Sequence, residues 1–251
     1  MTPLHALAIF AAGVLAGTIN TVVGSGTLFT FPVLLALGYA PVTANVSNTI
    51  GLVPGSVAGA IGYRRELRGQ GARTVRLAAA SLLGGTVGAI LLLTLPAAAF
   101  KAIVPVFIVL ALALILAQPR MTRALDRRRT RARPPAGGVA ALVGVLVSGV
   151  YGGYFGAAQG ILLLAILGLA LEEELQRINA LKVVLAGLVN LVAGLLFVFA
   201  ARVAWDAALL IAAGSTIGGL AGARAGRRLS PRVLRAVIVV VGTLAIVRLV
   251  S

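Results

Sequence analysis

The chain contains two copies of one apolar unit, which match at a constant offset of 134 residues. At this offset Asn45 matches Asn179. Most other matched positions hold small residues: Ser81, Gly84, Gly85, Gly88 and Ala89 match Ser215, Gly218, Gly219, Gly222 and Ala223, and at an offset of 132 Gly17 and Gly24 match Gly149 and Gly156. Internal similarity of this kind predicts two related structural units. The glycines at 84–88 and 218–222 favour close helix packing over ligand contact.

The basic residues of the two copies lie at opposite ends. Segment 64–76 contains five arginines, whereas its counterpart at 198–210 contains only one. Conversely, 96–101 contains only one basic residue, whereas its counterpart at 224–235 contains five arginines. Because loops rich in Lys and Arg remain in the cytoplasm, equivalent loops must lie on opposite faces of a membrane. The sequence therefore predicts two inverted-topology repeats, an arrangement typical of secondary transporters.

Composition places these repeats in a lipid bilayer. Of the 251 residues, 60% are hydrophobic, compared with roughly half in soluble domains, and the apolar runs are long and nearly free of charge. Such runs predict an all-α polytopic membrane protein, since helices satisfy their own backbone groups in lipid. We expect a first membrane repeat at 1–117, a basic cytoplasmic linker at 118–136 and a second membrane repeat at 137–251.

The net charge of +16 does not indicate a nucleic-acid partner. The arginines form short clusters between apolar runs, where the positive-inside rule explains them, and they predict contact with the bilayer surface. The chain has no cysteine, and His5 is its only histidine. This excludes thiol chemistry and metal sites built from cysteine or histidine, so we expect no cofactor and no metal.

Each repeat is expected to contain five apolar segments, one of them short. The segments lie at 4–22, 26–39, 45–63, 75–95 and 100–117, and at 137–157, 159–170, 178–199, 205–223 and 232–250. Segments 26–39 and 159–170 each follow a glycine-rich break. A helix of about a dozen residues rises roughly 18 Å, against a hydrocarbon core of roughly 30 Å, so each fits either a full crossing or a re-entrant hairpin. Short, glycine-interrupted segments at equivalent positions indicate a binding site near the bilayer midplane.

All six acidic residues lie in loops or at segment ends: Glu66, Asp126, Glu172, Glu173, Glu174 and Asp206. Proton relays and intramembrane enzymes need a carboxylate, a histidine or a metal inside the bilayer. We therefore expect no carboxylate proton relay, no site for a cation and no enzymatic activity.

The polar residues inside the expected segments favour an anion. Glycine breaks expose backbone N–H groups at helix N-termini, where the helix dipole attracts negative charge. Lys182 matches Asn48 at the repeat offset, so donors from both repeats converge. The alternative for Lys182 is extension of its side chain to the membrane interface. The candidate substrate-binding residues are Asn20, Gly24, Ser25, Gly26, Thr27, Asn48, Gly153, Gly156, Gln159, Lys182 and Asn190.

Several motifs resemble those of a known family. The run GTINTVVGSGTLFTFP at 17–32, ANVSNT at 44–49, GYRR at 62–65 and NALK at 179–182 resemble the TauE/SafE family of sulfite exporters, over about 4–250. The resemblance implies a bacterial inner-membrane permease for sulfite, sulfonates such as sulfoacetate, or other small organic anions. Ala157-Ala158-Gln159 departs from the fuller glycine-rich motif of the family, which bears on substrate choice.

These observations predict a secondary transporter that exports a small anion, such as sulfite or an organosulfonate, across the bacterial inner membrane. The alternatives are an anion channel, and a membrane-embedded enzyme or a subunit of a larger complex. The oligomeric state is open, a homodimer included.

The inverted arrangement predicts the outcome of a labelling experiment. Arg68 and Arg227 belong to different repeats, and the arginine distribution places both in the cytoplasm. The chain has no native cysteine, so Arg68→Cys and Arg227→Cys each introduce a single thiol. We expect a membrane-impermeant maleimide to label both variants from the cytoplasmic side only. Labelling from opposite sides would contradict the inversion.

Overall fold

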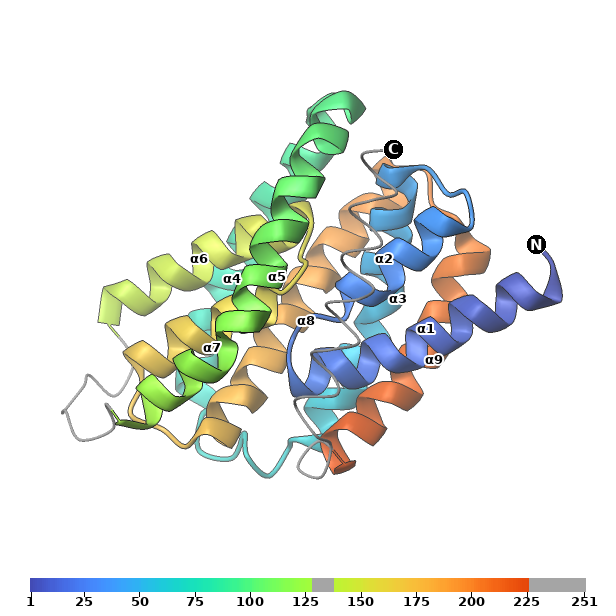
Figure 1. The fold of residues 1–251 in the computed structure, drawn as a ribbon. Coiled ribbons are helices and arrows are strands. Elements are labelled where there is room, and N and C mark those ends of the chain that lie inside the picture. The colour runs from blue at the N-terminus through green and yellow to red at the C-terminus, as the bar shows by residue number, and fades with distance from the viewer. Residues whose placement is uncertain (128–137, 226–251) are drawn as a thin grey trace.

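The computed structural model describes residues 1–127 and 138–225, and within these it contains nine α-helices and no strand (Figure 1). The helices are α1 (Pro3–Val22), α2 (Thr27–Ala36), α3 (Pro41–Gly62), α4 (Gly71–Thr94), α5 (Ala97–Arg127), α6 (Gly138–Tyr154), α7 (Gln159–Ala170), α8 (Leu175–Ala200) and α9 (Trp205–Ala225). The expected segment at 232–250 and most of the arginines of 224–235 lie outside the described residues.

Helix ends follow from local sequence. Thr2 caps α1, because its Oγ1 accepts a hydrogen bond from the His5 N–H at 3.2 Å. Pro3 begins α1 and Pro41 begins α3, at positions where a helix needs no N–H donor. After α2 the chain turns at Gly38, whose φ of 89° suits glycine best.

Five described helices are long and apolar enough to cross a membrane. They are α1, α4, α5 over Ala97–Met121, α8, and α9 over Trp205–Arg224. By contrast, α2 has 10 residues and α7 has 12, so they rise only roughly 15 to 18 Å. The two short helices that the sequence predicts after the glycine-rich breaks are therefore present, and the protein is an all-α, multi-pass membrane protein.

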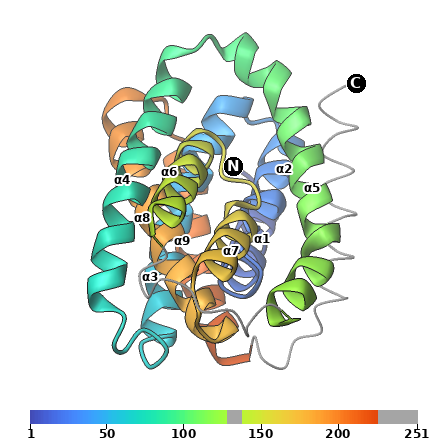
Figure 2. The same cartoon turned by 90° about the vertical axis from the view of Figure 1, so that its left-hand side faces the viewer.

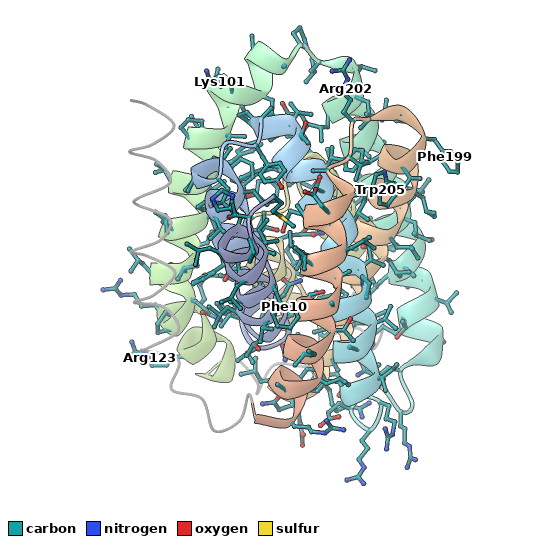
Figure 3. All side chains as sticks on the ribbon, turned by 90° about the vertical axis from the view of Figure 1, so that its right-hand side faces the viewer. Phe10, Lys101, Arg123, Phe199, Arg202 and Trp205 are labelled. Carbon is teal, nitrogen blue, oxygen red and sulfur yellow. The ribbon has the colours of Figure 1, made fainter. Side chains whose placement is uncertain are left out.

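Segments that the sequence predicts on opposite faces of the membrane lie toward opposite ends of the bundle. Lys101, Arg202 and Trp205 lie at one end, and Arg123 lies toward the opposite end (Figure 3). The first three belong to the loops expected outside, and Arg123 belongs to the basic linker expected in the cytoplasm. The orientation in the membrane stays a prediction.

The fourth helix of each half packs on the other half. Helix α4 packs against α6 and α8, and α9 packs against α1 and α3 (Figures 1 and 2). Helices α3 and α8 also pack against each other. The two halves therefore exchange helices across their interface, and neither half buries its apolar faces without the other.

Matched serines make matched contacts at this interface. The Ser81 hydroxyl donates to the Leu185 carbonyl oxygen at 2.9 Å, and the Ser215 hydroxyl donates to that of Gly51 at 2.7 Å. Both the donors and the acceptors are 134 residues apart. Two related halves would make such reciprocal bonds.

The paired glycines are packing positions. A Cβ on Gly84 would overlap the Leu146 carbonyl oxygen, and one on Gly218 would overlap the Val14 carbonyl oxygen. Small residues let helix backbones approach closely in membranes. This confirms packing as the role of these glycines.

Helix α5 extends further than the sequence predicts. It continues through Pro119 to Arg127, whereas the basic linker was expected to begin at 118. Ala and Arg are strong helix formers, which explains the continuation after the apolar span. The domain boundaries stay predictions.

Gly84→Ala and Gly218→Ala should each destabilise the protein by about 1–3 kcal/mol, because the added methyl group forces two helices apart. Gly71→Ala is the control, since a Cβ there meets nothing within 4 Å. Thermal unfolding in detergent measures the difference. Equal melting temperatures for all three variants would contradict the packing role.

Candidate functional site

The two glycine-rich breaks touch in the middle of the bundle (Figure 1). The backbone N–H of Gly160 donates to the Gly24 carbonyl oxygen at 3.0 Å. A Cβ on Gly24 would lie 2.5 Å from the Gly160 Cα, and the φ of Gly24 is 93°. Both the space and the backbone conformation therefore require glycine here. The contact joins the N-terminal ends of α2 and α7, one from each half.

Backbone donors without acceptors line both breaks. Among the described residues we find no acceptor for the N–H groups of Ser25, Gly26 and Thr27. The same holds for Ala157 and Ala158 at the second break. These groups form the positive ends of the α2 and α7 dipoles.

Two buried side chains at the breaks also lack partners. The Ser25 hydroxyl and the Gln159 Nε2 form no hydrogen bond with any described residue, although the two residues are only 1% and 3% exposed. A buried polar group without a partner costs free energy, so in native structures such a group usually forms a hydrogen bond with a water or a ligand. Both breaks thus present hydrogen-bonding groups that an anion could satisfy.

Asn48 fixes the start of α2. Its Nδ2 donates to the Thr27 hydroxyl at 3.2 Å, and its Oδ1 accepts from the Thr30 hydroxyl. Both ends of the amide are therefore used within the first half. Asn48 positions the first turn of α2 and orients the Thr27 hydroxyl beside the break.

Lys182 reaches from α8 into the other half. Its Nζ donates to the carbonyl oxygens of Asn20 at 3.2 Å and Thr21 at 3.3 Å, in the last turn of α1. The residue is 1% exposed, so its side chain does not extend to an interface. A cation at a helix C-terminus is stabilised by the dipole. No carboxylate of the described residues pairs with it.

Two asparagines cap the helices that precede the breaks. Asn179 Nδ2 donates to the Thr21 carbonyl oxygen at 3.2 Å and to the Tyr63 hydroxyl oxygen at 3.0 Å. Its match, Asn45, donates to the Tyr154 carbonyl oxygen at 3.0 Å, at the end of α6. The repeat offset paired these residues but did not show that each caps a helix of the opposite half.

The family model described as Sulfite exporter TauE/SafE matches residues 9–249. The chain belongs to the TauE/SafE family. "Probable membrane transporter protein YfcA" of Escherichia coli strain K12 is 26% identical over 242 residues, covering 96% of this chain and 88% of that protein. "Probable membrane transporter protein ORF9" of Sinorhizobium sp is 28% identical over 249 residues, covering 98% and 93%. No solved structure gives a significant match.

This TauE/SafE protein gathers most of the predicted site residues around the breaks. Two others lie elsewhere. A Cβ on Gly153 would overlap the Gly85 carbonyl oxygen, so Gly153 packs against α4. Asn190 is buried on α8 eight residues after Lys182, which is roughly 12 Å along the helix. Gly156 turns the chain at the second break with a φ of 76°, and Asn20 contributes its carbonyl oxygen.

Aromatic rings cover the second break. Phe155 packs edge-on against Phe31 and Phe100, with ring centroids 5.1 Å and 6.0 Å away. The Tyr151 hydroxyl donates to the Ala157 carbonyl oxygen, and Ala158 adopts a left-handed backbone with φ 59°. Among the described residues no group of carboxylates and histidines could hold a metal. The second break is therefore buried beneath aromatic rings, and both breaks present N–H groups without acceptors among the described residues.

Proposed function

We propose that this TauE/SafE protein is a secondary transporter that exports a small anion, a sulfur oxyanion or an organosulfonate, across the bacterial inner membrane. The observation that supports this most directly is Lys182, a buried lysine that contacts the last turn of α1, just before the first break, with no carboxylate partner among the described residues. The family description, Sulfite exporter, supports the substrate class and the direction.

The donor set explains why an anion would be preferred. A sulfite or sulfonate head has several oxygens, and each needs donors once water is removed. The N–H groups of Ser25, Gly26 and Thr27 and the Gln159 amide would supply such donors, and Lys182 would supply charge. A cation would find no carboxylate among the described residues of the site.

The buried site implies that the two halves must move for substrate to enter. Two polar links join the halves, and one member of each link is matched, since Tyr39 and Glu173 are 134 residues apart. The Tyr39 hydroxyl donates to Asp206 Oδ2 at 3.3 Å, and Arg73 Nη1 lies 3.0 Å from Glu173 Oε1. In the predicted topology the first link is outside and the second is cytoplasmic. We propose that each opening breaks one link while the other holds, as alternating access requires.

Lys182→Met should weaken binding of sulfite or sulfoacetate by about 1–3 kcal/mol, because a charge-assisted hydrogen bond is lost in a desolvated site. Lys182→Arg should also bind less well, since a planar guanidinium does not replace a compact ammonium. Lys101→Met is the matched control, because Lys101 is the only other lysine and is exposed. Calorimetry on the folded variants, with taurine as the zwitterionic comparison, measures the affinities.

Unchanged affinity in Lys182→Met would contradict the role of the lysine. The same variants in proteoliposomes test the class of transport: a carrier shows counterflow and saturation, and a channel shows neither.

The cytoplasmic link should hold at neutral pH. Burial raises the pKa of Glu173, but hydrogen bonds from Arg177 and Arg73 outweigh this and hold the pKa below its ordinary value. The link is therefore formed at neutral pH and is lost only when acid protonates the carboxylate. Glu173→Gln should open the cytoplasmic side at neutral pH, whereas the exposed neighbour Glu172→Gln should not.

A cysteine at the first break, Ser25→Cys, reports this opening. We expect an impermeant thiol reagent added on the cytoplasmic side to label it several-fold faster in Glu173→Gln than in Glu172→Gln. Equal labelling rates would show that the Arg73–Glu173 link does not close this side.

A further inference from the structure

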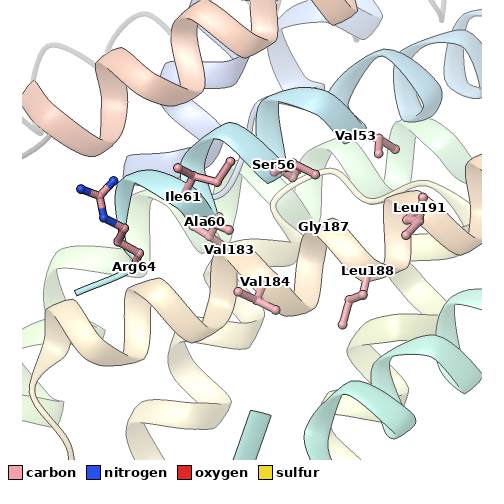
Figure 4. A pocket seen from close by; sticks show the side chains of 11 residues that line it. Val53, Ser56, Ala60, Ile61, Arg64, Val183, Val184, Gly187, Leu188 and Leu191 are labelled. Carbon is pink, nitrogen blue, oxygen red and sulfur yellow. The ribbon is translucent and has the colours of Figure 1, made fainter. Parts of the chain in front are cut away.

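An apolar groove runs along the outer side of the seam between α3 and α8 (Figure 4). It encloses about 390 Å³. Its walls are aliphatic side chains from both helices: Val53, Val57, Ile61, Val184, Leu188 and Leu191. None of the residues at the glycine-rich breaks lines it, so it is separate from the anion site.

The groove has almost no polar group to offer. Ser56 lines it, but its hydroxyl donates to the Leu52 carbonyl oxygen of its own helix at 3.0 Å. Gly187 lets α8 approach α3 closely at the bottom of the groove, because a Cβ there would lie 2.9 Å from the Ser56 Cβ. The rim is open, with Val57 54% and Ile61 53% exposed. A hydrocarbon chain fits this lining, and a small hydrophilic anion does not.

One end of the groove is basic. Arg64 and Ile61 line both the groove and a second pocket of about 280 Å³. That pocket is lined also by Arg65, Arg224 and one carboxylate, Glu66. All three arginines are exposed. The apolar groove thus leads into a polar pocket where positive charge exceeds negative charge.

We propose that this groove and pocket form a binding site for one anionic phospholipid of the surrounding bilayer. An acyl chain lies between α3 and α8, and the headgroup phosphate is bound by Arg64, Arg65 and Arg224. The arginines belong to segments that the charge distribution places in the cytoplasm, where anionic lipid faces the protein. The apolar groove lies along the membrane-spanning part of the helices, as an acyl chain does in the bilayer. The basic pocket lies at its end, where the headgroup phosphate would be.

The purified protein in detergent tests this, with phosphatidylglycerol and phosphatidylcholine as probes and native mass spectrometry and thermal unfolding as readouts. We expect phosphatidylglycerol to bind more tightly and to raise the melting temperature more. Arg64→Gln should lower the affinity for phosphatidylglycerol roughly fivefold, which is the effect of one arginine at a lipid surface. The affinity for phosphatidylcholine should not change. Arg123→Gln is the matched control, because Arg123 is an exposed arginine on α5, away from the groove.

A second pair of variants tests the acyl chain. Val57→Trp fills the groove and should weaken the binding of both lipids. Leu83→Trp is the control and should not weaken it, because Leu83 is exposed on α4 outside the groove. Equal binding of the two lipids to the wild type, or equal effects of Arg64→Gln and Arg123→Gln, would overturn the proposal. One further outcome would overturn the proposal. If the wild type is a dimer, and Val57→Trp dissociates it without reducing the binding of phosphatidylglycerol, a second copy of the chain occupies the groove.

Discussion

The backbone contact between Gly24 and Gly160 determines how the rest of the structure can be arranged. It brings the N-terminal ends of two short helices, one from each half, to one point. Neither residue tolerates a side chain there, so the distance between the halves is fixed by backbone atoms. The helices that precede the breaks then end inside the bundle, and their last carbonyl groups need donors. Asn45 and Asn179 supply them, each from the opposite half. The short helices and the asparagine caps are therefore arranged around this contact.

The scaffold contacts repeat between the halves, whereas the site contacts differ. Ser81 and Ser215 make the same bond at matched positions. Asn48 and Lys182 are also matched, but their partners are unrelated. Asn48 binds hydroxyls of α2 within its own half, and Lys182 binds carbonyl oxygens of α1 in the other half. A duplicated scaffold therefore holds one asymmetric site, with a hydroxyl-rich side and a cationic side. In the proposed function, such asymmetry would give a bound anion one preferred orientation.

The sequence predicted the scaffold well because repeat offset, glycine pairs and arginine clusters are local or periodic features. The short helices at 26–39 and 159–170 and the packing role of Gly84 and Gly218 all came from such patterns. The partners of Lys182 could not be predicted, because they depend on how closely α1 and α8 approach in space. From its position in the sequence alone, the Lys182 side chain could also have extended to the membrane interface. The continuation of α5 to Arg127 was not predicted, because the apolar run ends at 117, although most of the residues that follow have high helix propensity.

In the proposed function, the charge balance at the break would determine both how strongly an anion binds and why a cation does not. In the proposed function Lys182 acts as an ammonium, which two carbonyl oxygens and the dipole of α1 stabilise without neutralising it. A carboxylate in the same place would neutralise the charge and leave nothing for an anion to gain. With no carboxylate among the described partners of Lys182, the proposed site would attract an entering anion and repel an entering cation. The N–H groups of the short helices add donors whose directions are fixed by the backbone, so they need little reorganisation when the anion arrives. In the proposed function, the buried lysine and the two interrupted helices would together select an anion.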